Sequence, residues 1–289
     1  MQPLISIVIL THNKLDVTRR CLPTLLETRY APWELVVVDN GSTDGTPAWL
    51  DAFAQTAATR SVPVTVLRNP GNIGCSTSRN QGAGAARGAL IGFADNDVAL
   101  RDVHWLTELG ARFAHDPAVG MVGPKLVYPH APHAIQNAGT AVSRSGRILF
   151  RGRGEPREDP RFNVEDEVQC LISACCLASR RAFEAAWGFD EAFNPVEYED
   201  LDLCYRMRQL GYRLLYVPAV ELYHFESVTT AGTPSLPNTR LIIEHGLLFK
   251  QRWRHMFESE NGPPDAATAW RKLKVRPLAE IGDLPLRGD

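Results

Sequence analysis

The sequence has no long hydrophobic run, no strong net charge and no paired-cysteine motif. Its 31 Lys and Arg residues nearly balance 33 Asp and Glu residues, so no overall field attracts nucleic acid, and any site for a polyanion must be local. No apolar stretch approaches the roughly 20 residues that span a bilayer. The first residues also lack the basic segment and cleavage site of a signal peptide. We therefore expect a cytoplasmic protein that does not bind nucleic acid.

The six cysteines have neither CxxC spacing nor a His-rich partner segment, which argues against a structural zinc site. Reduced thiols fit a cytosolic protein. The neighbours Cys175 and Cys176 are either inert core residues or a redox switch or nucleophile. Burial is the more usual state of a free cysteine.

In the first hundred residues, short β-branched segments alternate with segments of helical spacing. Residues 5–10, 35–39, 62–67 and 89–94 are predicted strands, and a helix is expected at about 74–86. This alternation indicates an α/β protein with a mostly parallel central sheet flanked by helices. Ligands of such sheets gather at the carboxyl ends of the strands.

After residue 100 the pattern is looser. We expect a mobile, Arg-rich surface loop over 144–166, where the arginines either grip an anionic acceptor or are simply solvated among interleaved acids. We expect a Pro-rich tail beyond residue 261. The other predicted elements are helices at 105–113, 180–187, 199–210 and 238–257, with strands at 119–122, 135–142 and 213–217.

Polar residues follow the first two predicted strands. Thr11, His12 and Asn13 end the first strand, and Asp39 ends the second. A carboxylate at the end of a buried strand is costly unless it is paired, and a nucleobase N–H is one such partner. Asp44 is better explained as a helix cap than as a binding residue.

The segment that contains Asn72 leads into a predicted helix that carries Arg79. Free amides and the helix dipole favour phosphate at such a helix start, and Arg79 adds a cation. A dinucleotide-binding fingerprint is excluded, because the glycines at 82 and 84 close this helix instead of opening one after the first strand.

Two carboxylates, Asp95 and Asp97, come directly after the strand at 89–94. Together with phosphate oxygens they form a hard ligand set suited to Mg²⁺ or Mn²⁺. An Asp-x-Asp triplet is also common in turns, but its place at a strand end in register with Asp39 favours a metal site.

An acidic cluster opens the predicted helix at 199–210. Acids at a helix start are stabilised by the helix dipole whatever their function, and this accounts for Glu199 and Asp202. Arg206 is placed to pair with Asp202. We single out Asp200 as the functional residue of the cluster.

These motifs, in this order, resemble family 2 glycosyltransferases over Ile5 to about Phe257. The residues that carry the resemblance are Thr11-His12-Asn13, Val37-Val38-Asp39-Asn40-Gly41-Ser42-Thr43-Asp44, Asn69 to Gly74 with Arg79-Asn80, Asp95-Asn96-Asp97, Gly188-Phe189-Asp190-Glu191, Glu199-Asp200-Leu201-Asp202 with Arg206, and His224. The resemblance implies a GT-A fold in a single Rossmann-like domain with a smaller acceptor-side half. It also implies a nucleotide-diphosphate sugar donor, a divalent cation and inversion at the anomeric carbon.

The resemblance also implies a role for each matching residue. Asp200, next to Glu199, corresponds to the general base. Asp97 corresponds to a metal ligand, and His224 to the late histidine that completes the metal or diphosphate site. The expected donor-binding residues are Thr11, His12, Asn13, Asp39, Asn72, Arg79 and Asp95. Residues 172–177 depart from the Gly- and Ala-rich segment of relatives, so the acceptor cannot be inferred from them.

We expect a nucleotide-sugar-binding half over 1–100, an acceptor-binding and catalytic half over 101–258, and a C-terminal tail over 259–289. A UDP-sugar is the default donor and dTDP-rhamnose the alternative. The acceptor is a saccharide, a lipid-linked molecule or another hydroxyl compound, as in polysaccharide, glycolipid or glycoconjugate synthesis. The helix at 238–257 either packs on its own domain, as such apolar stripes usually do, or makes a peripheral contact with the inner face of a membrane.

Two other functions stay open. A sugar nucleotidyltransferase needs a Gly-rich, basic loop after the first strand, and Thr11-His12-Asn13-Lys14 is not such a loop. A non-catalytic sugar-nucleotide-binding protein does not require the acids Asp97, Glu199 and Asp200, all of which are present.

Overall fold

The computed structural model describes residues 2–226, 238–273 and 276–288. Its centre is a ten-stranded mixed sheet in the order β10-β12-β6-β11-β4-β1-β2-β3, with β5 paired to β12 and β7 paired to β6. A separate hairpin is formed by β8 and β9. The strands are β1 (Ile5–Thr11), β2 (Trp33–Asp39), β3 (Val64–Arg68), β4 (Leu90–Asp95), β5 (Val98–Leu100), β6 (Val119–Val127), β7 (Ile135–Asn137), β8 (Thr140–Val142), β9 (Ile148–Phe150), β10 (Asp166–Glu167), β11 (Cys175–Ser179) and β12 (Arg213–His224).

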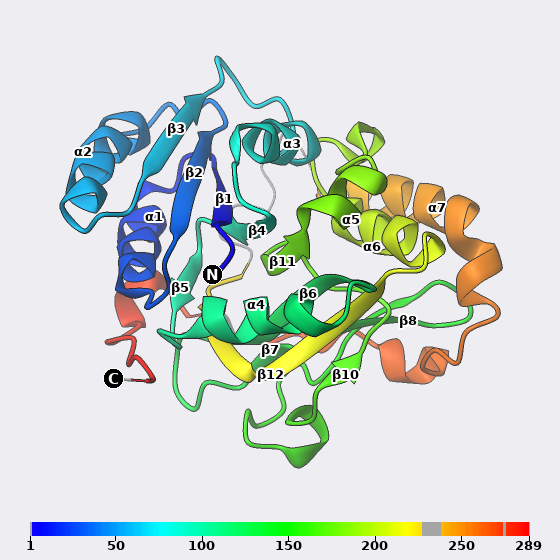
Figure 1. The fold of residues 1–289 in the computed structure, drawn as a ribbon. Helices are drawn as coiled ribbons and strands as arrows, with labels where there is room; N and C mark the ends of the chain where they lie inside the picture. Colours follow the sequence, from blue (N-terminus) through cyan, green and yellow to red (C-terminus); the bar gives the residue numbers. More distant parts are fainter. Residues whose placement is uncertain (1, 227–237, 274–275, 289) are drawn as a thin grey trace.

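Helices cover both faces of the sheet (Figure 1). They are α1 (Leu15–Cys21), α2 (Thr46–Thr59), α3 (Cys75–Ala85), α4 (Trp105–His115), α5 (Arg180–Ala185), α6 (Glu199–Gln209) and α7 (Asn238–Phe257). Side chains of β2 alternate between the faces: Leu35 and Val37 pack with α2 and α4, whereas Val36 and Val38 lie in the core that α3, α5, α6 and α7 cover. The mixed α/β class predicted from the sequence is confirmed.

The first half of the sheet is parallel and the second half is mixed. β3, β2, β1 and β4 run in the same direction, as the strand–helix alternation predicts. β11 is antiparallel to both β4 and β6, and β6 and β12 are again parallel. A strand running against its neighbours therefore joins the two halves into one sheet.

The strand predicted at 213–217 extends to His224. The predicted strand ends before Pro218, whereas in the structure the pairing with β6 shifts register between Val217 and Glu221 and then resumes. A bulge of this kind accommodates a proline, which cannot donate to the ladder. His224 therefore stands at the end of a largely buried strand.

The loop expected over 144–166 contains more regular structure than predicted, namely β9, β10 and a 3-10 turn, Pro160–Phe162. Several of its arginines are paired, for example Arg151 with Asp166 and Arg153 with Glu226. These cations already have carboxylate partners, which weakens the idea that they grip an anionic acceptor.

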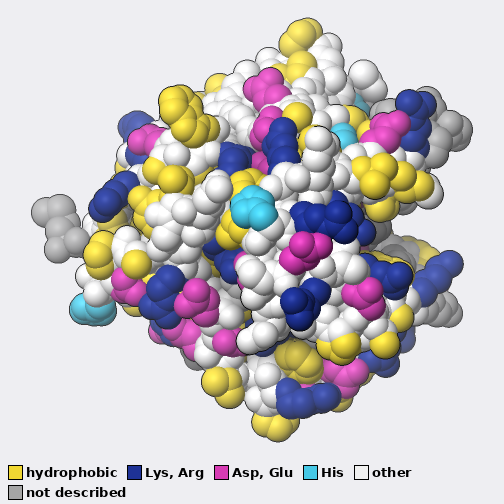
Figure 2. Space-filling view, turned by 90° about the vertical axis from the view of Figure 1, so that its right-hand side faces the viewer, with side chains coloured by type: hydrophobic (Ala, Val, Ile, Leu, Met, Phe, Trp, Pro, Cys, Tyr) yellow, Lys and Arg dark blue, Asp and Glu magenta, His cyan; other side chains and the backbone are white. Residues whose placement is uncertain are grey.

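Helix α7 packs on its own domain through residues spaced four apart. His245, Phe249, Trp253 and Phe257 are buried, while Ile242, Ile243 and Leu247 are exposed on the other side. Figure 2 shows the face of the molecule on the α7 side, where basic, acidic and hydrophobic side chains are interspersed. Within the described ranges, we find no helix with the length and apolar content to cross a membrane.

The predicted tail packs against the first half of the chain. Arg20 donates hydrogen bonds to the carbonyl oxygens of Leu278, at 3.1 Å, and Ile281, at 2.6 Å. Ile281 is buried in a small cluster with Val17 and Phe225. All six cysteines are free and buried, as expected for inert core thiols.

Candidate active site

Three polar strand ends meet at one edge of the parallel half of the sheet. In the register of β1 with its neighbours, Thr11 pairs with Asp39 and Leu10 pairs with Asp95. The predicted donor-binding residues of the first half therefore converge, because carboxyl ends of parallel strands lie side by side.

Two of these residues, His12 and Asn13, contact the loop that follows β2. The Asn13 side-chain oxygen accepts hydrogen bonds from the amides of Thr43, at 2.8 Å, and Asp44, at 3.3 Å. His12 Nδ1 lies 2.9 Å from the carbonyl oxygen of Asn40. These contacts hold the loop after β1 against the loop after β2, and so they shape the edge of the site.

Two further predicted donor residues, Asp39 and Asn72, have similar contacts. Asp39 is buried, and its Oδ1 accepts a 3.0 Å hydrogen bond from the Ser42 amide. The Asn72 side-chain oxygen accepts from the Asn40 amide group and from the Gly74 backbone, both at 2.9 Å. The loop ahead of α3 is thereby tied to the end of β2.

Thr11 is buried, and its hydroxyl lies 3.5 Å from that of Thr18. Thr18 also accepts a 2.8 Å hydrogen bond from Asn96, the residue between the two predicted metal-site acids. Asn96 therefore anchors the turn that carries Asp95 and Asp97, a role that the sequence pattern did not reveal.

Asp95, Asp97 and His224 form a cluster in which each residue offers one ligand atom, and these three atoms lie within 4.8 Å of one another. His224 Nε2 is 3.4 Å from Asp97 Oδ1. The approach follows from the sheet, because β5 pairs with β12 so that Val98 faces His224. Two carboxylates and an imidazole at this spacing fit one divalent ion such as Mn²⁺ or Mg²⁺, whose ligands lie about 2.0–2.2 Å away.

The electrostatics of this cluster favour a cation. Burial raises the pKa of Asp95; Arg79 opposes this, and the neighbouring charge of Asp97 adds to it. Burial alone would lower the pKa of His224, but the charge and hydrogen bond of Asp97, together with the charges of Asp95 and Glu226, outweigh burial and the pKa is raised. The neighbouring acids Asp95 and Asp97 thus repel each other, and a positive charge between them relieves the repulsion.

Arg79 links this cluster to the acidic start of α6. One guanidinium nitrogen donates to Asp95 at 2.8 Å, and another donates to Glu199 at 2.6 Å. The guanidinium is buried and lies over the ring of Phe189. The sequence assigned Arg79 to the donor phosphate or ribose; in the structure its side chain bridges two carboxylates.

Asp200 is held by two backbone amides. Its Oδ2 accepts from Ser173 at 3.0 Å, and its Oδ1 accepts from Leu201 at 2.8 Å. Burial, followed by the nearby charge of Glu199, raises the pKa of Asp200 to about 7. The carbonyl oxygen of Ala174, the residue after Ser173, accepts a 3.0 Å hydrogen bond from the Asp95 amide. The same short segment therefore contacts both the metal cluster and the acid of α6.

The neighbouring acid Asp202 has a structural role. It is fully buried and accepts hydrogen bonds from Arg206 at 2.7 Å and from the indole of Trp253 at 2.9 Å. This confirms the predicted pairing with Arg206, and it also ties α6 to α7.

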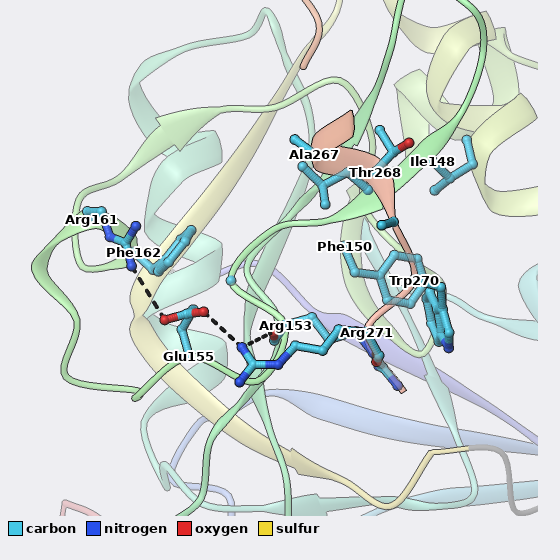
Figure 3. Close-up of a pocket in the computed structure, with 13 residues that line it drawn as sticks. Ile148, Phe150, Arg153, Glu155, Arg161, Phe162, Ala267, Thr268, Trp270 and Arg271 are labelled. Carbon is cyan, nitrogen blue, oxygen red and sulfur yellow. Dashed lines mark hydrogen bonds and ion pairs between the residues drawn. The ribbon is translucent and has the colours of Figure 1, made fainter. Parts of the chain in front are cut away.

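A groove of about 240 Å³ lies elsewhere, between the 144–166 segment and residues 267–271. Figure 3 shows Phe150, Phe162 and Trp270 around it, with Glu155 joined to Arg161 and Arg271. None of the predicted site residues lines this groove.

Residues 6–187, more than half of the chain, match the family model described as glycosyl transferase family 2. The chain belongs to glycosyl transferase family 2. The resemblance to family 2 glycosyltransferases that the motif order indicated is therefore confirmed.

Two curated proteins are similar to this family 2 chain in sequence. Uncharacterized protein y4gI of Sinorhizobium fredii is 32% identical over 273 residues, which cover 92% of this chain and 29% of y4gI. The chain thus spans less than a third of that relative. The N-acetylglucosaminyl-diphospho-decaprenol L-rhamnosyltransferase of Mycobacterium tuberculosis is 29% identical over 271 residues, 81% of this chain and 80% of the relative.

Among solved structures, GalNAc-T7 with UDP, GalNAc and Mn²⁺ aligns with a TM-score of 0.65 at 20% sequence identity, covering 77% of this chain and 44% of the other. At this identity the likeness concerns the fold alone. It confirms the expected GT-A type of fold.

Proposed function

We propose that this family 2 chain transfers a sugar from a nucleotide-diphosphate sugar to an acceptor hydroxyl, with inversion at the anomeric carbon. Asp95, Asp97 and His224 hold Mg²⁺ or Mn²⁺, and Asp200 is the general base. One observation carries the proposal: the metal cluster and the acidic start of α6 meet at a single guanidinium, that of Arg79.

The donor side of the reaction uses the polar strand ends. A bound divalent cation supplies positive charge that neutralises the diphosphate as it leaves. We assign donor binding to the edge formed by Thr11, Asp39 and Asp95, with His12, Asn13 and Asn72 shaping its loops. Arg79 orients Asp95 through its 2.8 Å hydrogen bond and opposes the rise in the pKa of that acid.

On the acceptor side, Asp200 takes the proton of the attacking hydroxyl. A general base works best when its pKa lies near the operating pH, and proton transfer of this kind contributes roughly 10²–10⁴-fold. The pKa of about 7 suits this role. The amides of Ser173 and Leu201 fix the carboxylate in one orientation. The negative charge of Glu199, whose carboxylate is held by Arg79, contributes to the raised pKa of Asp200. Attack opposite the leaving diphosphate gives inversion without an enzyme nucleophile.

For the substrates, we propose a UDP-sugar or dTDP-rhamnose as donor and a saccharide or lipid-linked hydroxyl as acceptor, in polysaccharide or glycoconjugate synthesis. The name of the Mycobacterium tuberculosis relative supports a rhamnosyl donor and a lipid-linked acceptor, and the UDP in the GalNAc-T7 structure supports the first alternative. We propose a cytoplasmic location. The exposed Ile242, Ile243 and Leu247 of α7 support a peripheral contact with the inner face of the membrane. Vesicle flotation tests whether the protein binds to a membrane or stays free.

The wild-type protein with Mn²⁺ is assayed against a panel of UDP-sugars and dTDP-rhamnose, with saccharide and polyprenyl-diphosphate acceptors. We expect nucleotide diphosphate release that depends on the acceptor, and a product whose anomeric configuration, read by NMR, is opposite to that of the donor. A product with retained configuration would contradict inversion, and acceptor-independent binding without turnover would favour the non-catalytic alternative.

A further inference from the structure

A chain of buried polar side chains lies behind His224. His224 Nδ1 is 3.3 Å from Gln136 Oε1, on the side of the ring away from Asp97. Gln136 Nε2 in turn donates to Glu226 Oε1 at 3.1 Å. All three side chains are buried, and buried polar groups of this kind are normally satisfied by hydrogen bonds.

Glu226 is held as an anion by further donors. Arg153 donates to both carboxylate oxygens, and the Tyr128 hydroxyl donates to Oε2 at 2.8 Å. Arg153 is itself fixed on its other side, because its guanidinium lies 4.0 Å from the ring of Trp270 and its Nε donates to the carbonyl of Arg271 at 3.0 Å. Figure 3 shows these three residues together at one end of the groove.

The charge on Glu226 sets the direction of every hydrogen bond in the chain. An ionised carboxylate can only accept, so the amide nitrogen of Gln136 must face it. The amide oxygen of Gln136 then faces His224, and this oxygen can also only accept. His224 must therefore carry a proton on Nδ1, which leaves the lone pair of a neutral ring on Nε2, the atom nearest Asp97.

The backbone supports a specific role for Glu226. Its φ is +58°, a left-handed conformation that is uncommon for residues other than glycine. Such strain persists only where the surroundings hold it, and it is concentrated at functional sites. Here the four hydrogen bonds to the Glu226 carboxylate hold the side chain in place.

We propose that Gln136 and Glu226 are positioning residues that fix the tautomer and the ring orientation of His224, so that Nε2 is presented to the metal ion. This inference rests on the proposed role of His224 as a metal ligand. Partners behind a metal-bound histidine typically change metal affinity by about 10–100-fold when they are removed. The 144–166 segment and residues 267–271 act on the metal site through Arg153, although the groove that they form contains no metal ligand.

The first test is the affinity for Mn²⁺ alone, followed by the electron paramagnetic resonance signal of free Mn²⁺. Gln136→Met, which keeps the length of the side chain but removes its polar atoms, should weaken Mn²⁺ binding about 10–100-fold. Glu226→Gln should weaken it as well, because the new amide lets Gln136 turn over. The matched control is Gln169→Met, since Gln169 bonds Val142 and Glu260 and contacts no metal-cluster residue.

The second test reads the tautomer in the metal-free protein. Long-range ¹H–¹⁵N spectra of histidine-labelled protein are recorded at a pH high enough that the His224 signals no longer move, with His224→Ala used for assignment. We expect a protonated Nδ1 and an unprotonated Nε2 in the wild type, and a shift toward the other tautomer in Glu226→Gln. Protonation at Nε2 in the wild type would overturn the proposal.

The variants also separate this proposal from the proposed function. If His224→Ala binds Mn²⁺ as tightly as the wild type, His224 is not a ligand and both the metal assignment and the positioning role are wrong. If His224→Ala weakens binding but Gln136→Met and Glu226→Gln do not, only the positioning role is refuted. Circular dichroism of each variant confirms that it is folded.

Discussion

In the first hundred residues, Thr11, Asp39 and Asp95 reach the site because β1, β2 and β4 are parallel and end at one edge. In the second half, His224 and Asp200 reach the same place through contacts between residues far apart in the sequence. His224 depends on β12 continuing past Pro218, and Asp200 depends on the amide of Ser173. In the function that we propose, the first half supplies a platform for the donor, and the second half delivers the groups that complete the metal site and remove the proton.

We expect the largest effect from a substitution in the metal cluster. Asp97→Ala removes one of the two carboxylates of the metal cluster and leaves His224 without its 3.4 Å partner. We expect Mn²⁺-dependent donor affinity to fall at least about a hundredfold, because the remaining acid and imidazole form an incomplete ligand set. Calorimetric titration with nucleotide diphosphate, with and without Mn²⁺, measures the loss.

The control for this variant is Asp51→Ala, which removes an exposed acid of α2 that pairs with Arg68. Its Mn²⁺-dependent affinity should match the wild type. If Asp97→Ala also matches the wild type, the cluster is not the metal site.

A second prediction concerns the acid of the other half. The pKa of Asp200 is raised to about 7 by burial and by the charge of Glu199, while Ser173 and Arg79 oppose the rise. A general base must be deprotonated, so kcat should increase with pH through about 7 and should fall about tenfold for each pH unit below it. Initial rates at saturating donor and acceptor between pH 5.5 and 8.5 provide the profile. A kcat that stays constant across this range would contradict the assignment.

The smallest effect concerns the C-terminal segment, which closes onto the first half. Arg20→Met removes the hydrogen bonds to the carbonyls of Leu278 and Ile281. Hydrogen bonds from a charged donor contribute about 1.5–3 kcal/mol each, and part of this is recovered when the released carbonyls meet water. We expect the free energy of unfolding to drop by about 1–2 kcal/mol in urea denaturation.

Arg19→Met, a neighbouring exposed arginine on α1, is the matched control and should change stability by less than about 0.5 kcal/mol. If the two variants are equally stable, the segment does not contribute to the fold in the way that its contacts indicate.

The same comparison explains what could be predicted from the sequence. Strand ends in the parallel half follow from local periodicity, so Asp39, Asp95 and Asp97 were placed correctly at one sheet edge. Asp200 was singled out from the acidic cluster that opens its helix, and His224 was chosen by motif order; the roles of both stay predictions. Nothing local shows that Arg79 joins Asp95 to Glu199, because these residues meet only after β4, α3 and α6 have packed.

Gln136 and Glu226 were missed for a related reason. Neither belongs to a motif, and each lies close to other polar residues, Asn137 beside Gln136 and His224 two residues before Glu226. Their function depends on β7 lying beside β6, and on Arg153 reaching Glu226 from the 144–166 segment. Charge count alone suggested solvation for that arginine, whereas the fold gives it a buried carboxylate partner. A buried glutamine next to a predicted metal-binding histidine is the signal that could have been sought, but the contact itself is visible only in three dimensions.

The central claim is that the metal cluster and Asp200 act on opposite sides of one transferred sugar. The most direct measurement compares Asp200→Asn with the wild type in two assays on the same preparation, nucleotide-sugar binding in the presence of Mn²⁺ and transfer to acceptor. The account predicts donor affinity within about threefold of the wild type and a loss of transfer of about 10²–10⁴-fold. Transfer at the wild-type rate by Asp200→Asn, or loss of Mn²⁺-dependent donor binding together with transfer, would contradict it.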